Sequence, residues 1–204
     1  MKKFRAIIFL AALAACGGKK TDEPIAPRRS GEPSYSAMTG KSMIVGKPTL
    51  VRMGLKPLEA KEARGYMNSV FNELLPDLEK TNITYQMAGN DIILTIQAHL
   101  VLEDGKIREY IRPQLENFAK TLVKNDRTFV EFRGFTSSVG NKSANLRRSL
   151  AEAQEVAEFF LERGVAGERV FIAGMGESMW IADNSTREGR LLNSRIEVRI
   201  APLI

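Results

Sequence analysis

The segment GFTSSVGNKSANLRRSLAEAQEV, residues 134–156, gathers side chains suited to binding chemistry. It begins as a polar loop that carries the hydroxyls of Thr136 and Ser137 and then continues as a helix. Asn145, Ser149 and Glu152 follow at positions i, i+4 and i+7, a spacing that places them on one helix face. Because hydroxyl, amide and carboxylate groups can hold a polar ligand by hydrogen bonds, the pattern predicts a polar binding site.

The sequence offers little for catalysis or for a metal. The one histidine is His99, after the IILTIQ run, and the one cysteine is Cys16. Neither a metal cluster nor a Cys-His or Ser-His-Asp arrangement can be assembled in the familiar way from so few groups. We therefore expect His99 to be a packed or surface residue, the protein to be no enzyme, and no metal or other cofactor to be required.

Cys16 closes the N-terminal stretch MKKFRAIIFLAALAAC. A short basic start precedes an apolar run that is too short to cross a bilayer as a helix, so residues 1–15 are interpreted as a secretory signal peptide. The run LAAC resembles a bacterial lipobox, in which the cysteine becomes the acylated first residue of the mature protein. The alternative is that Cys16 is only a small residue near an ordinary cleavage site. With no second cysteine, an intramolecular disulfide is excluded.

We expect a covalent lipid on Cys16, and several acyl chains on one residue hold a protein firmly in a membrane. Gly17 follows, where lipoproteins retained in the inner membrane commonly carry an aspartate. That resemblance implies a lipid-anchored protein on the periplasmic face of the outer membrane. The formal net charge of +6 falls to +3 without Lys2, Lys3 and Arg5, and so weak an excess does not indicate nucleic-acid binding.

Two segments precede the main domain. Residues 16–45 are rich in Gly, Pro, Ser and charged residues, which predicts a flexible tether. Residues 46–82 are interpreted as a helical extension, with a helix from Pro57 to Leu75 that Pro76 stops. The apolar positions that recur at helical spacing in it are Ala63, Met67, Val70, Phe71 and Leu74.

Residues 83–204 alternate between strand and helix patterns. The run ITYQMAGNDIILTIQ predicts a hairpin about Gly89, Asn90 and Asp91. A helix is expected over residues 112–124, with Pro113 in its first turn. Its apolar stripe consists of Ile111, Leu115, Phe118 and Leu122. The run TFVEFRGF predicts a strand on which Val130 and Phe132 face one way while Glu131 and Arg133 face the other.

A third helix is predicted over residues 142–163, ended by Gly164. Its expected buried stripe consists of Leu146, Leu150, Ala153, Ala157 and Phe160. RVFIAGMG and SRIEVRI supply two more strands. The predicted fold class is therefore α/β: a two-layer domain with a mixed four-stranded sheet and helices packed on one face.

GFTSSVGN, the helix that carries Asn145, Ser149 and Ala153, and ERVFIAGMGESMWIADNSTREGRLLNSRIEVRI together resemble the OmpA-like domain of outer-membrane proteins, Pal-type lipoproteins and flagellar stator proteins. The resemblance covers roughly residues 91–201. It implies a pocket that grips the diaminopimelate of a peptidoglycan stem peptide without breaking a bond. In that family a Thr-Asp pair and an arginine on the following helix clamp the zwitterionic end of diaminopimelate through charge-assisted hydrogen bonds.

Two clamp positions depart from the family pattern. Thr136 matches, but Ser137 stands at the aspartate position and Glu152 at the arginine position. A hydrogen bond to a charged group contributes about 1.5 to 3 kcal/mol, so losing two weakens binding roughly a hundredfold to ten-thousandfold. We favour a vestigial site in which Arg148 and Glu152 form an ion pair. A swapped clamp, with Glu152 on the ammonium and Arg147 or Arg148 on the carboxylate, is the alternative.

Gly140, Asn145 and Arg195 also fall on family positions. Their structural alternatives are that Gly140 shapes a turn, that Asn145 caps or braces the helix start, and that Arg195 is a solvated strand end. The predicted degenerate pocket comprises Thr136, Ser137, Gly140, Asn145, Ser149, Glu152 and Arg195.

Met179 and Trp180 lie in ESMWIADN, where the family usually has a polar or proline-containing stretch. Trp180 is open to two interpretations: a cap on the edge of the core, or an exposed contact for a protein partner beside Met179.

The expected function is that of a non-catalytic outer-membrane lipoprotein whose degenerate domain docks onto other proteins of an envelope assembly. Lipoproteins of this kind resemble accessory subunits of type IVB (Dot/Icm-like) secretion core complexes. The alternative is an anchor that links the outer membrane to the cell wall through diaminopimelate. Expected partners are thus the outer membrane through the lipid, envelope or secretion-complex proteins, and peptidoglycan only weakly.

Overall fold

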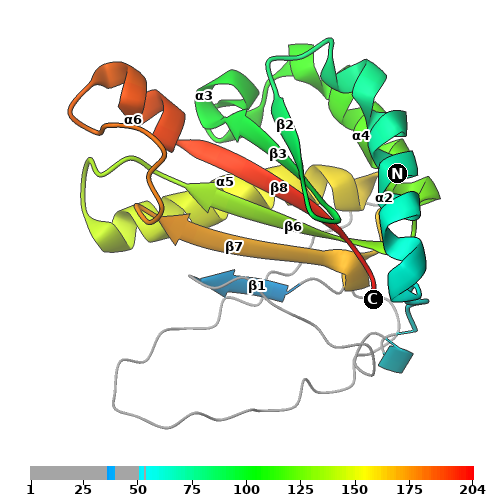
Figure 1. The fold of residues 1–204 in the computed structure, drawn as a ribbon. Coiled ribbons are helices and arrows are strands. Elements are labelled where there is room, and N and C mark those ends of the chain that lie inside the picture. The colour runs from blue at the N-terminus through cyan, green and yellow to red at the C-terminus, as the bar shows by residue number, and fades with distance from the viewer. Residues whose placement is uncertain (1–35, 40–50, 53) are drawn as a thin grey trace, which may run out of the picture. The chain divides into compact units, whose positions relative to one another are not determined.

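The fold was described from a computed structural model, drawn in Figure 1. The structure describes residues 36–39, 51–52 and 54–204. Cys16, the predicted signal peptide and most of the predicted tether lie outside the described residues. None of the described helices is long and apolar enough to cross a membrane.

A mixed six-stranded sheet forms one layer, in the order β1-β7-β6-β8-β3-β2. The strands are β1 Ser36–Thr39, β2 Thr84–Ala88, β3 Asp91–Gln97, β6 Thr128–Phe135, β7 Val170–Gly176 and β8 Arg195–Pro202. β1, β7 and β6 are parallel, whereas β8, β3 and β2 pair antiparallel. The predicted mixed α/β, two-layer class is confirmed. The predicted four-stranded sheet has six strands, because both arms of the predicted hairpin join it as β2 and β3, and β1 comes from the segment interpreted as tether.

The helices are α2 Ala60–Leu78, α3 Ala98–Val101, α4 Arg112–Lys124, α5 Lys142–Glu162 and α6 Arg187–Asn193. Short elements complete the chain: β4 Leu102–Glu103, β5 Lys106–Ile107, and the 3-10 helices η1 Glu109–Ile111 and η2 Gly167–Arg169. The predicted bounds of α4 agree with the structure, and Pro113 lies in its first turn. The hairpin also agrees, except that Asp91 pairs with Ala88 and so begins β3 instead of lying in the turn.

One hydrophobic core joins the helices to the sheet. Met67 of α2, Leu115 of α4 and Val156 of α5 belong to the same buried cluster as Phe132 of β6 and Val198 of β8. α2 therefore packs with residues 83–204 instead of forming a separate extension. Fully burying side chains of this size contributes about 1.5 to 3 kcal/mol each, which explains why the segment joins the domain.

The prediction that Pro76 ends α2 was wrong: the helix continues through Pro76 to Leu78. The hydrogen bond that Pro76 cannot donate would go to the carbonyl of Asn72, and both residues are exposed, so water can satisfy that carbonyl. Leu78 is fully buried. Burial of Leu78 stabilises the extra residues of helix beyond the proline.

α5 approaches β6 and β7 unusually closely at its first turns. A Cβ at Gly134 would lie 1.9 Å from the carbonyl oxygen of Ser149, and one at Gly174 would lie 2.7 Å from that of Leu146. At this distance only small side chains fit between helix and sheet. Consequently Asn145 and Ser149 are buried there, whereas Leu146 and Leu150, predicted on the buried stripe, are only partly buried.

The second face of the sheet carries a ladder of ion pairs. Val130 and Phe132 face the core as predicted, but Glu131 on the other face is 2% exposed and not solvated. Arg199, its cross-strand neighbour, contacts the Glu131 carboxylate at 3.4 Å and that of Asp91 at 2.7 Å. Opposite charges at paired positions stabilise neighbouring strands.

Candidate functional site

The parallel strands β6 and β7 end at the same edge of the sheet, next to α6 (Figure 1). Residues 136–141 lead from β6 to α5, and residues 177–186 lead from β7 to α6. A shallow depression of about 300 Å³, which we call the polar depression, lies between the first of these loops, the start of α5 and α6. Its lining residues are Thr136, Ser137, Val139, Asn145, Arg148, Arg187, Arg190, Leu191 and Ser194.

Backbone hydrogen bonds fix the loop that follows β6. The N–H of Thr136 donates to the carbonyl of Gly176 at 2.7 Å. The N–H of Ser137 donates to Oγ of Ser194 at 3.3 Å, and that of Ser138 donates to Oδ1 of Asn184 at 3.1 Å. These contacts join the loop after β6 to the end of β7, to the loop after β7 and to the residue before β8. The backbone beside the depression is therefore held in place.

The start of α5 is organised by three residues. Asn141 is the N-cap, and its Oδ1 accepts from the N–H of Ser143 at 2.9 Å. Gly140 has φ of +104°, which agrees with the turn-shaping alternative. Asn145 is not the cap; it braces the loop by donating from Nδ2 to the carbonyl of Ser137 at 3.4 Å and to the Glu177 carboxylate at 3.2 Å.

Ser149 lies away from the polar depression although it was predicted as a pocket position. It is fully buried where α5 touches the sheet. Its hydroxyl donates to the carbonyl of Leu146 at 2.9 Å and accepts from the N–H of Gly176 at 2.9 Å. Both hydrogen-bonding functions of the hydroxyl are therefore used within the fold, and Ser149 has a packing role.

Glu152 does not line the depression either. Its Oε1 accepts from Nε of Arg148 at 2.7 Å, which is the ion pair that the sequence favoured. The side chain of Glu152 is only 12% exposed, and Oε2 is buried with no hydrogen-bond partner among the described residues. Arg148 lines the depression, whereas Arg147 and Glu152 do not, so the swapped clamp is not assembled.

Arg195 is not the solvated strand end that we considered. It is 1% exposed, and its guanidinium stacks over the ring of Phe135 with 3.9 Å to the ring centroid. Nε contacts the Glu197 carboxylate at 2.8 Å, and Nη2 donates to the carbonyl of Met179 at 3.0 Å. Arg195 thus ties the loop after β7 to the last strand.

Sequence reasoning missed the lining residues of α6 and its C-cap: Arg187, Arg190, Leu191 and Ser194. A usable signal exists at Thr186, whose hydroxyl caps α6 by accepting from the N–H of Gly189 at 3.0 Å. Threonine followed by an acidic first turn is a helix-start pattern. Recognising it would have placed two arginines beside the loop that follows β6.

Among the described residues, the depression is lined by three arginines, Arg148, Arg187 and Arg190, and by no carboxylate. Arg190 donates from Nη1 to the carbonyls of Asn184 and Ser185, both at 2.9 Å. The chemistry of the lining is suited to an anion.

The loop that accepts these hydrogen bonds has its own local contacts. Hydrogen bonds from the Ser185 hydroxyl and then from its backbone N–H hold the pKa of Asp183 below its ordinary value.

The loop after β7 presents apolar side chains to solvent. Met179, Trp180 and Ile181 are 65%, 53% and 57% exposed. Asn193, which is fully buried, fixes the backbone behind them: its Oδ1 accepts from the N–H of Ile181 at 2.8 Å and of Ala182 at 3.0 Å. Trp180 therefore does not cap the core, and it is held outward on an ordered loop.

Nothing in the described part of the chain is arranged for metal chemistry: no group of three or more His, Cys, Asp or Glu side chains in residues 36–39, 51–52 and 54–204 is placed to hold an ion. His99 is exposed on α3, as one of the two expectations had it.

Comparison with known proteins agrees with this fold. Residues 103–194 match the OmpA family. The chain is similar to the probable lipoprotein YiaD of Escherichia coli, with 29% identity over 142 residues that cover 68% of this chain and 64% of YiaD. It is 38% identical to the peptidoglycan-binding protein ArfA of Mycobacterium tuberculosis over 69 residues, 34% of this chain and 21% of ArfA. The chain thus spans less than two thirds of these relatives.

Among solved structures, the fold is similar to that of a putative MotB-like protein from Desulfovibrio vulgaris. The TM-score is 0.61 at 18% identity, over 70% of this chain and 94% of that one. At this identity the similarity concerns the fold alone.

Proposed function

We propose that this chain, whose residues 103–194 carry an OmpA family domain, is a structural lipoprotein of the bacterial envelope that docks onto other envelope proteins. The similarity to the lipoprotein YiaD and the lipobox-like run before Cys16 support acylation of that cysteine and attachment to the periplasmic face of the outer membrane. The domain has a binding and positioning role and no catalytic one.

The observation that carries the docking proposal is the outward presentation of Trp180 between Met179 and Ile181. All three side chains are more than half exposed, on a backbone held by Asn193 and Arg195. Neighbouring exposed apolar side chains mark interaction surfaces, and tryptophan is enriched among the residues that dominate binding energy. A fixed loop also loses little conformational entropy when a partner binds.

Photocrosslinking in intact cells tests this proposal. A photoreactive amino acid at position 180 should give discrete adducts with one or a few envelope proteins. The same amino acid at Tyr110, which is 58% exposed on η1, is the matched control and should give far weaker adducts. Equal labelling from both positions, or none from position 180, would contradict docking through this loop.

Among envelope assemblies, a type IVB (Dot/Icm-like) secretion core complex is our preferred candidate, since lipoproteins with a degenerate domain of this kind resemble its accessory subunits. Mass spectrometry of the adducts from position 180 identifies the assembly. Recovery of components of an unrelated envelope machine would retain docking and reject this particular assignment.

A second candidate is an anchor that binds peptidoglycan through diaminopimelate. The similarity to a protein named as peptidoglycan-binding and the retained Asn145 favour it. The lining of the polar depression opposes it, because none of the described residues places a carboxylate there to hold the ammonium group of diaminopimelate. Recovery of the chain with purified sacculi separates the two candidates.

A further inference from the structure

We propose that the polar depression binds the free carboxylate of a peptide, and not a zwitterion. The site lies beside residues 177–186, which carry Trp180 and which we call the docking loop, but it is lined by other residues. Binding of a carboxylate there does not depend on whether Trp180 contacts a protein.

The arginines that line the depression retain unused donors. Arg187 is exposed and makes no hydrogen bond or ion pair with any described residue. Within the described structure, Arg190 donates through Nη1 alone, to two carbonyl groups, and Arg148 through Nε alone, to Glu152. A guanidinium group presents its N–H groups in a fork that matches the two oxygens of a carboxylate. The lining therefore offers several such donors to one anion.

A buried hydroxyl adds a neutral donor. Thr136 is 4% exposed and belongs to the lining, yet its Oγ1 is buried without a hydrogen-bond partner in the described structure. Buried polar groups nearly always have partners, so this hydroxyl is unusual. Because Oγ1 is closed to solvent, a carboxylate reaches it only when the Thr136 side chain turns toward the depression, and the arginines are the donors that an entering anion meets first.

Two carboxylates that contact residues of the lining are already engaged. Glu152 pairs with Arg148, and Glu177 accepts from Asn145 and lies 3.8 Å from the ammonium of Lys142. An ammonium group entering the depression would therefore meet the guanidinium groups of the lining, where no described carboxylate is placed to hold it. Like-charge contact weakens such binding, so the lining favours an anion over a zwitterion.

The apolar part of the lining favours a peptide over a small inorganic anion. Val139, 62% exposed, and the half-buried Leu191 border the same depression as the arginines. The volume of about 300 Å³ exceeds what a lone carboxylate or phosphate fills. A C-terminal residue with a small side chain uses both the arginines and this apolar wall.

Titration of the isotope-labelled full chain by NMR tests the inference, with N-acetyl-alanyl-alanine as the probe. Its free carboxylate should cause saturable shifts of the amides of Thr136, Ser137 and residues 187–194. The C-terminal amide of the same dipeptide should cause none, and inorganic phosphate and meso-diaminopimelate should bind more weakly. Equal binding of the amide would overturn the carboxylate proposal. Tighter binding of phosphate than of the dipeptide would reject a peptide as the ligand. Tighter binding of diaminopimelate would reject the carboxylate proposal in favour of a site for a zwitterion.

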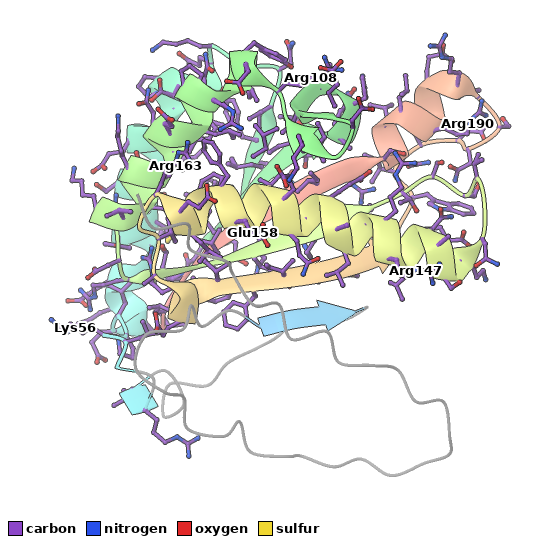
Figure 2. The ribbon with its side chains drawn as sticks, turned by 180° about the vertical axis from the view of Figure 1, so that it is seen from behind. Lys56, Arg108, Arg147, Glu158, Arg163 and Arg190 are labelled. Carbon is purple, nitrogen blue, oxygen red and sulfur yellow. The ribbon has the colours of Figure 1, made fainter. Side chains whose placement is uncertain are left out.

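Two variants assign the shifts to the site. Arg187→Gln should weaken binding of the dipeptide about threefold to tenfold, because one exposed charge-assisted contact is lost. Arg147→Gln is the matched control, since Arg147 lies on α5 at the same end of the molecule as Arg190 (Figure 2) but outside the lining, and it should leave the affinity unchanged. Ser137→Asp places an acid in the depression and should abolish binding. Equal effects of Arg187→Gln and Arg147→Gln, or full binding by Ser137→Asp, would refute the site.

Discussion

The Glu152 carboxylate accepts a 2.7 Å hydrogen bond from Nε of Arg148, one turn earlier on α5. The position at which the family pattern has a ligand-binding arginine thus carries an acid, Glu152, whose carboxylate pairs within α5. Its partner Arg148 lines the polar depression. The charge of the depression is therefore set by the arginines of α5 and α6 together.

Glu152→Gln should release Arg148 toward the depression. The Arg148 side chain is 68% exposed, so water screens the pair and its loss should change the free energy of unfolding by less than about 1 kcal/mol. Affinity for N-acetyl-alanyl-alanine should rise about threefold, because one guanidinium is freed and one negative charge is removed. Glu155→Gln, one turn further along α5, makes the same charge change and should leave the affinity unaltered. A lower affinity for Glu152→Gln than for wild type would be evidence against the anion site.

Gly134→Ala should destabilise the domain by about 3 kcal/mol or more, since the new Cβ would overlap the carbonyl oxygen of Ser149. Gly65→Ala is the control, and it should change the free energy of unfolding in the opposite direction. Gly65 lies inside α2 with open space around its Cα, so alanine should stabilise the helix by about 0.5 to 1 kcal/mol. Urea unfolding of both variants measures the difference. A tolerated Gly134→Ala would show that α5 can move away from β6.

Asn193→Ala should cost about 2 to 4 kcal/mol, because the N–H groups of Ile181 and Ala182 lose their shared acceptor. The same change should loosen the docking loop. Trp180 is the one tryptophan of the chain, so its fluorescence reports on this loop alone. We expect solvent-exposed emission in the wild type and a lower anisotropy in the variant. A blue-shifted wild-type emission, typical of a buried ring, would contradict the exposed loop.

Glu158 should make stability depend on pH in the acid range. Burial, and then the neighbouring Glu155, raise the pKa of Glu158 above its ordinary value, with Lys106 opposing (Figure 2 labels Glu158 on α5). The folded state therefore holds the proton more tightly than the unfolded state. Stability should fall as pH rises from the ordinary glutamate pKa through the raised one.

Glu158→Gln removes this titration. At neutral pH it should stabilise the domain by a few tenths of a kcal/mol, and the decline in stability across the acid range should become shallower. Glu155→Gln is a contrasting variant and should slightly destabilise the domain at neutral pH, because it removes the ion pair in which Glu155 accepts from Lys106 at 2.8 Å. An unchanged pH profile for Glu158→Gln would reject the raised pKa.

Elements with strong local signals were predicted well from the sequence. α4 has a periodic apolar stripe and a proline in its first turn, and both its ends were placed correctly. Gly164 ends α5 as expected: it has φ of +94°, and the N–H of Val165 donates to the carbonyl of Phe160. These features depend on residues close together in the chain.

Features that depend on tertiary contact were missed. The four-residue run SAMT is too short to indicate β1 by itself, and β1 forms by pairing with the edge of β7. The burial of Ser149 in place of Leu150 depends on glycines in two other strands. For the same reason the candidate site was only partly predicted. Thr136, Ser137 and Asn145 were placed in it, but Arg187 and Arg190 reach it from α6, about fifty residues further along the chain.

Cosedimentation with purified sacculi is the most direct test of the central claim, which is that the depression no longer clamps diaminopimelate. The wild-type chain should remain mostly in the supernatant, whereas Ser137→Asp combined with Glu152→Arg should sediment at least tenfold more strongly, because the acid and the base are both restored. Free meso-diaminopimelate should compete with the double variant only. Strong sedimentation of the wild type that diaminopimelate displaces and the double change fails to improve would contradict the account.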